Sequence, residues 1–212
     1  DALIKMTSHN IHHLPVTVNG QLAGMVTVTD LMDQQGNNAV NMANLIKKAD
    51  NLEQLVKLSK MLPKLLLKMA KLGTSAEHAG KTISAITMAF TLRLLKMAEQ
   101  QLGPAPVPYA WLAAGSQARQ EQLAHSDQDN AIIIDDSYQP QHAQWFHRLA
   151  KLVCDGLAAC GFSYCPGDIM ATNPKWCQPK AVWHKYFSQW LNTPEPQALL
   201  NASVFFDLNT VY

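Results

Sequence analysis

The chain has 212 residues, of which 48% are hydrophobic and 16% are charged, so it can form a sizeable core and global disorder is excluded. Its formal net charge of +1 at pH 7 gives no electrostatic case for binding nucleic acid or a membrane surface. Its four cysteines lack a C-x-x-C pair, which argues against a zinc site, and the sequence shows neither a signal peptide nor an apolar run of about eighteen residues. We therefore expect a cytoplasmic protein without nucleic-acid or membrane partners.

The N-terminal segment predicts a β-hairpin. Asn19 and Gly20 form a strong hairpin-turn pair. Strand-like runs flank this pair over residues 11–16 and 22–28. A helix is expected to begin near Thr29, and a polar linker follows it.

Residues 39–101 predict a helical bundle. Apolar side chains recur there every three or four positions, which is the spacing of one helical face. Pro63 interrupts the pattern, so we expect two helices before Gly73 ends the second one. Thr74 or Ser75 would cap a further helix that continues to the end of the segment. Taken alone, this segment would be an interaction or spacer module.

Residues 102–212 alternate between strand and helix patterns, which indicates an α/β unit. The chain opens within a pattern and stops just after a strand-like run, so we expect a fragment of a longer protein. Strands are expected at 109–114, 131–134, 162–165 and 203–208, and helices at 141–159 and 180–191.

Asp127 and Asp129 are the strongest chemical signal in this unit. Residues two apart on a strand point the same way, so both carboxylates would face one side. Two like charges this close are unfavourable without a cation between them, and Mg²⁺ takes one or two carboxylates together with phosphate oxygens. A solvated loop is the simpler interpretation of the same two acids, and their surroundings must decide between the two.

The surroundings favour phosphate chemistry. Gly115 and Ser116 follow an apolar strand and would let a phosphate approach the backbone. Asp207 stands at the end of the last predicted strand, where it would help to hold a metal ion or take a proton from an acceptor hydroxyl. Arg119 would neutralise phosphate charge, pair with Glu121, or do both.

The segment GSQARQEQLAHSDQDNAIII resembles the signature of the DNA polymerase β-like nucleotidyltransferase superfamily. More closely, it resembles the nucleotidyltransferases associated with CBS and cyclic-nucleotide-binding domains, which are relatives of the uridylyltransferases that modify nitrogen-regulatory proteins. The runs GFSYCPGDIMATNPKW and VFFDLNTVY resemble two further blocks of that family. The chain departs from the family pattern at Ala118, where glycine is usual, and at Asn209, where arginine is usual.

This resemblance implies an α/β (α+β) nucleotidyltransferase fold with a mixed sheet. It also implies a signalling enzyme that transfers a nucleoside monophosphate from an NTP to a hydroxyl of a protein or small molecule, with Mg²⁺ or Mn²⁺. Asn173 has a second interpretation, because Asn-Pro followed by a packed Trp176 is also a structural turn. The implied residues are Asp127, Asp129 and Asp207 for catalysis and metal binding, Gly115, Ser116, Arg119 and Ser126 for the nucleotide phosphates, and Glu121, Asn130 and Asn173 in support.

Residues 1–36 resemble the second half of a CBS domain. In that family, the positions of Thr27 and Asp30 often contact the ribose and phosphates of an adenosyl ligand. A CBS cleft needs a further strand and helix and usually a partner repeat, which this chain does not contain. For this chain we therefore favour a buried threonine and a helix N-cap, and we expect an adenosyl regulator only at a complete CBS pair.

The resulting organisation has three parts: a partial CBS domain over 1–36, a helical linker over 39–101 and a nucleotidyltransferase domain over 102–212, with a homodimer left open. Two alternatives remain. The departures at Ala118 and Asn209 suit a non-catalytic nucleotide-sensing module. A pure interaction module built on the helical segment would bind no nucleotide at all.

Overall fold

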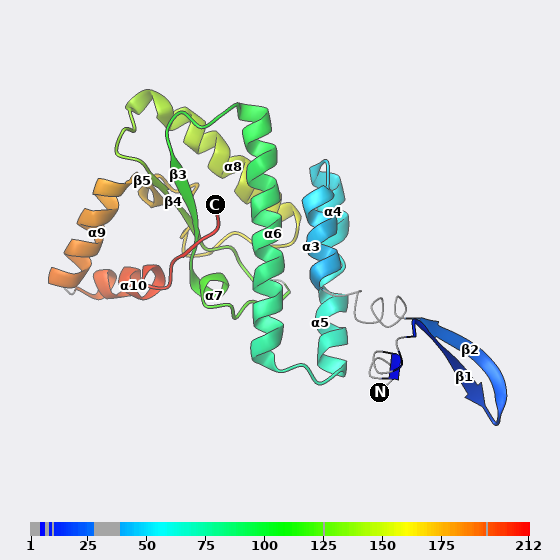
Figure 1. Cartoon of the computed structure of the whole chain (residues 1–212). Helices are drawn as coiled ribbons and strands as arrows, with labels where there is room; N and C mark the ends of the chain where they lie inside the picture. The colour runs from blue at the N-terminus through cyan, green and yellow to red at the C-terminus, as the bar shows by residue number, and fades with distance from the viewer. Residues whose placement is uncertain (1–4, 7–8, 10, 28–38, 125, 194) are drawn as a thin grey trace. The chain divides into compact units, whose positions relative to one another are not determined.

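The computed structural model describes residues 5–6, 9, 11–27, 39–124, 126–193 and 195–212 (Figure 1). The chain divides into two compact units, residues 1–44 and residues 45–212.

The N-terminal unit contains the predicted hairpin. Strands β1 (His13–Val18) and β2 (Gln21–Thr27) pair antiparallel, with an irregularity in register between Val16 and Thr17. Asn19 and Gly20 take positive φ angles of 52° and 80° at the turn, which are the backbone angles that this residue pair tolerates best. The hairpin prediction is therefore confirmed, whereas the helix predicted near Thr29 lies outside the described residues.

The helical segment forms more helices than the sequence predicted. The prediction of two helices before Gly73 was wrong, because the Asn51 side chain accepts a hydrogen bond from the Gln54 N–H at 3.0 Å and starts a helix there. Pro63 lies in the first turn of the next helix, where a missing N–H costs little. Ser75 caps the long helix, as expected. The helices are α3 (Ala39–Lys48), α4 (Leu52–Ser59), α5 (Leu62–Lys71) and α6 (Ala76–Leu102).

The C-terminal unit is built on a mixed sheet with the strand order β5-β4-β3-β6. The central pair β3 and β4 is antiparallel, β4 and β5 are parallel, and β6 is antiparallel to β3. The prediction of a mixed-sheet α/β fold is confirmed. The strands are β3 (Tyr109–Ala113), β4 (Asn130–Ile134), β5 (Cys177–Pro179) and β6 (Asn209–Thr210).

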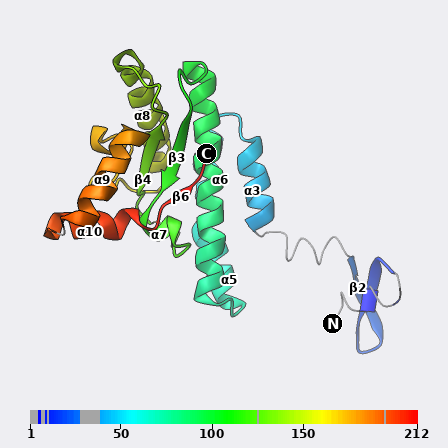
Figure 2. The same cartoon turned by 60° about the vertical axis from the view of Figure 1, so that its left-hand side comes forward.

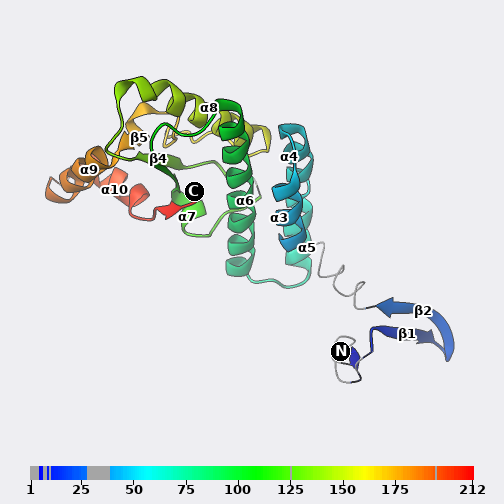
Figure 3. The same cartoon turned by 45° about the horizontal axis from the view of Figure 1, so that its top comes forward.

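Helices cover both faces of this sheet (Figures 2 and 3). On one side, α6 packs against α8 (Ala143–Ala159), and α5 packs against α6 in turn. On the other side, α9 (Lys180–Asn192) and α10 (Pro196–Phe205) bury an aromatic cluster against Leu112 and Ala131 of the central strands. Each central strand therefore has apolar side chains on both faces, which explains why its sequence is apolar throughout.

Two predicted strands are wrong. Residues 203–208 do not form a strand: most of them lie in α10 or in the turn after it, because Phe205 packs against Trp176 at a ring-centroid distance of 4.5 Å. Residues 162–165 contribute only an isolated bridge between Tyr164 and Gln128. The remaining short elements are α7 (Gly115–Ala118) and the 3-10 turns η1 (Pro140–His142) and η2 (Pro174–Trp176).

Candidate functional site

The segment that leads into β4 alternates between an inward and an outward side. Gln128 and Asn130 point inward and are each 3% exposed. Gln128 Nε2 donates to the carbonyls of Cys154 and Phe162 at 3.1 and 3.0 Å, respectively. Asn130 Oδ1 accepts from the Ala171 N–H at 2.8 Å. These buried amides fix the segment to the end of α8 and to the chain that follows it.

The other side of the segment carries Asp127 and Asp129. Because side chains alternate along an extended chain, both carboxylates point away from the buried amides. They meet the Cys165 thiol, and one ligand atom from each of these three residues lies within 4.8 Å of the other two. The structure therefore brings the two predicted carboxylates together and adds a sulfur that the sequence argument did not include.

Gly115 lies directly against this group, at the start of α7. Its φ angle of 56° is in the left-handed region, and a Cβ atom there would collide with the Asp129 carboxylate. The Ala114 N–H donates to the Asp129 carbonyl at 3.0 Å, so the first turn of α7 is fixed beside the acid. Only glycine meets both requirements at this position. Ser116 follows in the same turn, where the first N–H groups of a helix have no intrahelical partner.

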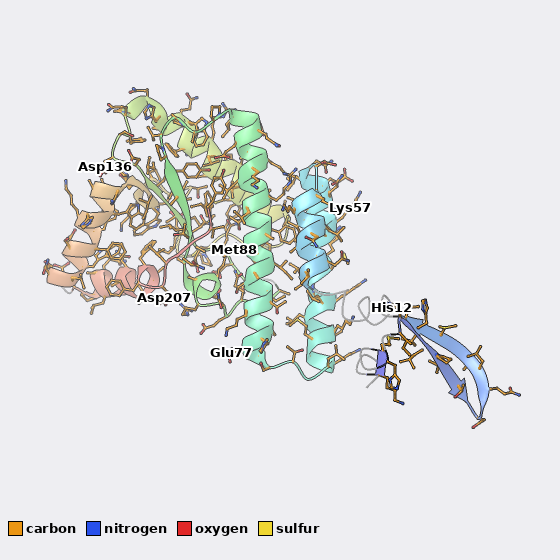
Figure 4. The ribbon with its side chains drawn as sticks, viewed as in Figure 1. His12, Lys57, Glu77, Met88, Asp136 and Asp207 are labelled. Atoms are coloured by element: carbon orange, nitrogen blue, oxygen red, sulfur yellow. The ribbon has the colours of Figure 1, made fainter. Side chains whose placement is uncertain are left out.

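Arg119 ends α7 and connects two further predicted residues. Its Nε donates to Glu121 at 2.9 Å and its Nη1 to Asp207 at 3.4 Å. The Asp207 side chain is 44% exposed and lies beside α7, beyond the end of α10 (Figure 4). The predicted position of Asp207 at a strand end is wrong, and it is not part of the three-residue group around Asp129.

The electrostatics of Asp129 suit a cation. Burial raises the pKa of the Asp129 carboxyl, and the charge of Asp127 raises it further, whereas a hydrogen bond from Cys165 and the charge of Arg119 lower it. Burial also raises the pKa of the Cys165 thiol, as does its bond to Asp129. A half-buried acid beside a second acid is therefore destabilised in its charged form, and a bound cation would relieve this.

A pocket of about 870 Å³ opens beside Asp127. Its walls come from α5, from the turn before Asp127 and from the segment around Tyr164. Among the described residues, no lysine or arginine lines it. The lining is Pro63, Leu66, Leu67, Ala70, Leu123, Ala124, Ser126, Asp127, Ser163, Tyr164 and Pro166, and we call this cavity the α5 pocket.

The sequence that carries this site matches a known family model. Residues 60–197 match the model of the family described as Putative nucleotidyltransferase DUF294. The chain belongs to the DUF294 family. The match includes Gly115, Asp127, Asp129 and Cys165, supports a role in nucleotidyl transfer, and ends before Asp207. Nucleotidyltransferases of this kind typically use divalent metal ions.

Residues 1–36 match the model of the CBS domain, as the sequence resemblance implied. Thr27 is the last residue of β2 and is only partly buried, so the prediction of a buried threonine was wrong, because the edge of a two-stranded hairpin leaves it accessible. Asp30, the predicted N-cap, lies outside the described residues. The search of curated proteins finds no match to the chain. Among the helices that the structure describes, none combines the length and apolar character needed to cross a membrane.

Two other predicted residues of this DUF294 protein have local structural roles. Ser126 Oγ accepts from the Leu123 N–H at 2.9 Å and closes the turn before Asp127. Asn173 Oδ1 accepts from the Lys175 N–H at 2.9 Å, which forms the expected Asx turn. Trp176 is buried in the aromatic cluster, as the structural interpretation predicted. A contact of Asn173 with nucleotide stays a prediction.

Cys165 is the residue that sequence reasoning missed. Pairs of cysteines at close spacing are the usual sequence signal of a metal site, and Cys165 has no neighbouring cysteine at such an interval. It reaches the site because Gln128 pairs with Tyr164, so the next residue is placed beside Asp129. The available signal was its place in the GFSYC run that resembles a family block.

Proposed function

We propose that the site around Asp127 and Asp129 transfers a nucleoside monophosphate from an NTP to a hydroxyl group, with Mg²⁺ or Mn²⁺. The proposal rests chiefly on two carboxylates that face one side of a rigid segment, within 4.8 Å of each other and of a third ligand atom. Membership of the DUF294 family supports it. A divalent ion held by these two acids would neutralise charge on the triphosphate and on the leaving pyrophosphate.

The triphosphate would lie on the α7 side of the acids. Gly115 and Ser116 offer backbone N–H groups at the start of a helical turn, and Arg119 offers a guanidinium. The Arg119 ion pairs with Glu121 and Asp207 are exposed, so they contribute little to stability and can exchange for phosphate contacts. Ser126 would hold the acids in place from the other end.

The acceptor would enter from the α5 pocket. Its lining is mostly apolar and, among the described residues, carries no cationic side chain that would attract a phosphate, whereas Asp127 lies at its edge. The acceptor oxygen forms a bond to the α-phosphorus while the bond from that phosphorus to pyrophosphate breaks. The hydroxyl proton leaves to a carboxylate. We propose Asp207 either for this role or as a further metal ligand, and both roles require its side chain to leave Arg119 and turn toward the two acids.

The CBS part would regulate this reaction. We propose that an adenosyl nucleotide binds at a complete CBS pair, to which Thr27 and Asp30 would contribute, and that the helical segment 39–101 links it to the catalytic domain 102–212. The proposal includes a protein acceptor in a cytoplasmic signalling pathway. It also includes a homodimer. Binding of adenosyl nucleotides to a chain with both CBS repeats would test it.

The catalytic proposal is tested by pyrophosphate release with each NTP in the presence of Mg²⁺ or Mn²⁺. We expect release with at least one NTP, and no release when the metal is chelated. Tight NTP binding without turnover would instead support a non-catalytic nucleotide sensor, which the departures at Ala118 and Asn209 favour. The absence of any metal-dependent nucleotide binding would leave only the interaction module.

A further inference from the structure

We propose that Cys165 is a third protein ligand of the metal site at Asp127 and Asp129, so that this site prefers a thiophilic divalent ion such as Zn²⁺ to Mg²⁺. The inference rests on the proposed function only in that the two carboxylates hold a metal. It concerns which ions the site binds, and this can be measured without turnover.

The geometry fits one ion bound to all three residues. The three ligand atoms lie within 4.8 Å of one another. Zinc binds sulfur at about 2.3 Å and carboxylate oxygen at about 2.0–2.2 Å in a tetrahedral arrangement, so two ligands of one ion are about 3.5 Å apart. A small closure of side chains that are only partly buried therefore completes the site.

The chemistry of the donor set decides which ion is preferred. Mg²⁺ takes oxygen ligands in near-octahedral geometry and keeps several waters. A thiolate selects borderline and soft ions, and zinc accepts sulfur and carboxylate oxygen together. Two carboxylates alone would suit Mg²⁺ or Mn²⁺, so the sulfur is what changes the preference.

The sulfur is held in place by the turn that follows it. The Cys165 N–H donates to Met170 Sδ at 3.3 Å, and the Cys165 carbonyl accepts from the Asp168 N–H at 3.0 Å. The Asp168 carbonyl in turn accepts from Trp176 Nε1 at 3.0 Å, which connects this turn to the aromatic cluster. The thiol therefore approaches Asp129 from a fixed backbone, and a metal ligand gains affinity from such preorganisation.

The test uses the whole chain and Co²⁺ as a spectroscopic substitute for Zn²⁺. The wild type should show a sulfur-to-cobalt charge-transfer band, which Cys165→Ser should lose. Cys165→Ser should also bind Zn²⁺ at least about tenfold more weakly, with little change in Mg²⁺ affinity. Cys177→Ser is the matched control, because Cys177 is also partly buried but lies outside the three-residue group. Circular dichroism establishes that each variant is folded.

Equal Zn²⁺ affinity in wild type and Cys165→Ser, or a cobalt band that survives this substitution, would overturn the inference. The proposed function can fail separately. Metal-dependent transfer with unchanged zinc binding in Cys165→Ser would reject the thiol ligand alone. A cobalt band that depends on Cys165, without transfer from any NTP, would reject the transferase alone.

Discussion

The two sides of the segment from Asp127 to Asn130 differ in the burial of their side chains and in the groups that those side chains contact. Gln128 and Asn130 are buried and make hydrogen bonds to backbone groups of other elements. Asp127 and Asp129 are partly exposed and meet a thiol and a glycine instead. A chain with a two-residue repeat can thus carry structure on one side and chemistry on the other. The unfavourable pair of acids is tolerated because the buried amides of Gln128, between them, and Asn130, directly after them, hold the backbone.

The largest effect should come from the outward side. Asp127→Asn and Asp129→Asn should each lower NMP transfer at least about 100-fold, because each removes a charged oxygen from the proposed metal site. The fold should be retained, since asparagine keeps the shape of the side chain and its amide oxygen can still accept the hydrogen bond that Cys165 donates to Asp129. Steady-state transfer with the best NTP measures this effect. Glu53→Gln is the control, because that exposed acid forms an ion pair with Lys57 on the same helix and lies outside the site. Near-normal transfer in both aspartate variants would contradict the site.

The inward side should instead determine stability. Gln128→Ala removes the buried side-chain amide that donates to the carbonyls of Cys154 and Phe162, so the free energy of unfolding should fall by about 2–3 kcal/mol. Urea denaturation checks this. Gln178→Ala is the control: its amide also donates to a carbonyl, that of Pro174, but at the surface, so it should cost less than about 1 kcal/mol. Equal losses in the two variants would show that burial is not the cause.

Gly115 is needed both for its positive φ angle and for the space that it leaves beside the Asp129 carboxylate. Substitutions at Gly115 and at Gly103 separate these two requirements. Gly115→Ala and Gly103→Ala both place a Cβ at positive φ, which should cost each variant about 1–3 kcal/mol. Only at Gly115 does the new atom strike Asp129, whereas Gly103 has open space around it. Metal affinity should therefore fall in Gly115→Ala alone, as measured by calorimetry. A similar loss in both variants would point to a general disturbance.

The smallest effect concerns pH and the metal-free protein. The pKa of Asp129 is raised in the folded state. Its ionisation therefore lowers the free energy of unfolding, and this loss is absent in acid and develops as the pH rises through the raised pKa. With a chelator present, Asp129→Asn should therefore unfold at a slightly higher temperature than the wild type at neutral pH. The difference should vanish in acid. Thermal melts across this range measure it, and a variant less stable at neutral pH would contradict the sign.

The sequence predicted what depends on local chemistry. Asn19 and Gly20 form the expected turn, Ser75 caps the expected helix, and the alternation around Asp127 is as expected. The predictions failed where contacts between residues far apart in the sequence determine the local structure. The run that contains Phe205 has the composition of a strand, but it is helical because that ring packs in the aromatic cluster. Tertiary packing overrides propensity there.

The same difference between local spacing and long-range contacts applies to the candidate site. Asp127 and Asp129 follow from a two-residue spacing that the structure preserves. Cys165 does not, because its place beside Asp129 depends on the bridge between Gln128 and Tyr164, a pairing between segments far apart in sequence. The pairing of Asp207 with Arg119 likewise depends on how the chain returns after α10. Long-range pairing is what a single sequence specifies least directly.

The central claim is that Asp127 and Asp129 form a metal-dependent nucleotide site, and calorimetric titration of NTPs tests it most directly. The wild type should bind at least one NTP in Mg²⁺ and lose this binding in chelator. The folded double variant Asp127→Asn/Asp129→Asn should bind no NTP under either condition. Unchanged NTP binding by that variant in Mg²⁺ would contradict the claim.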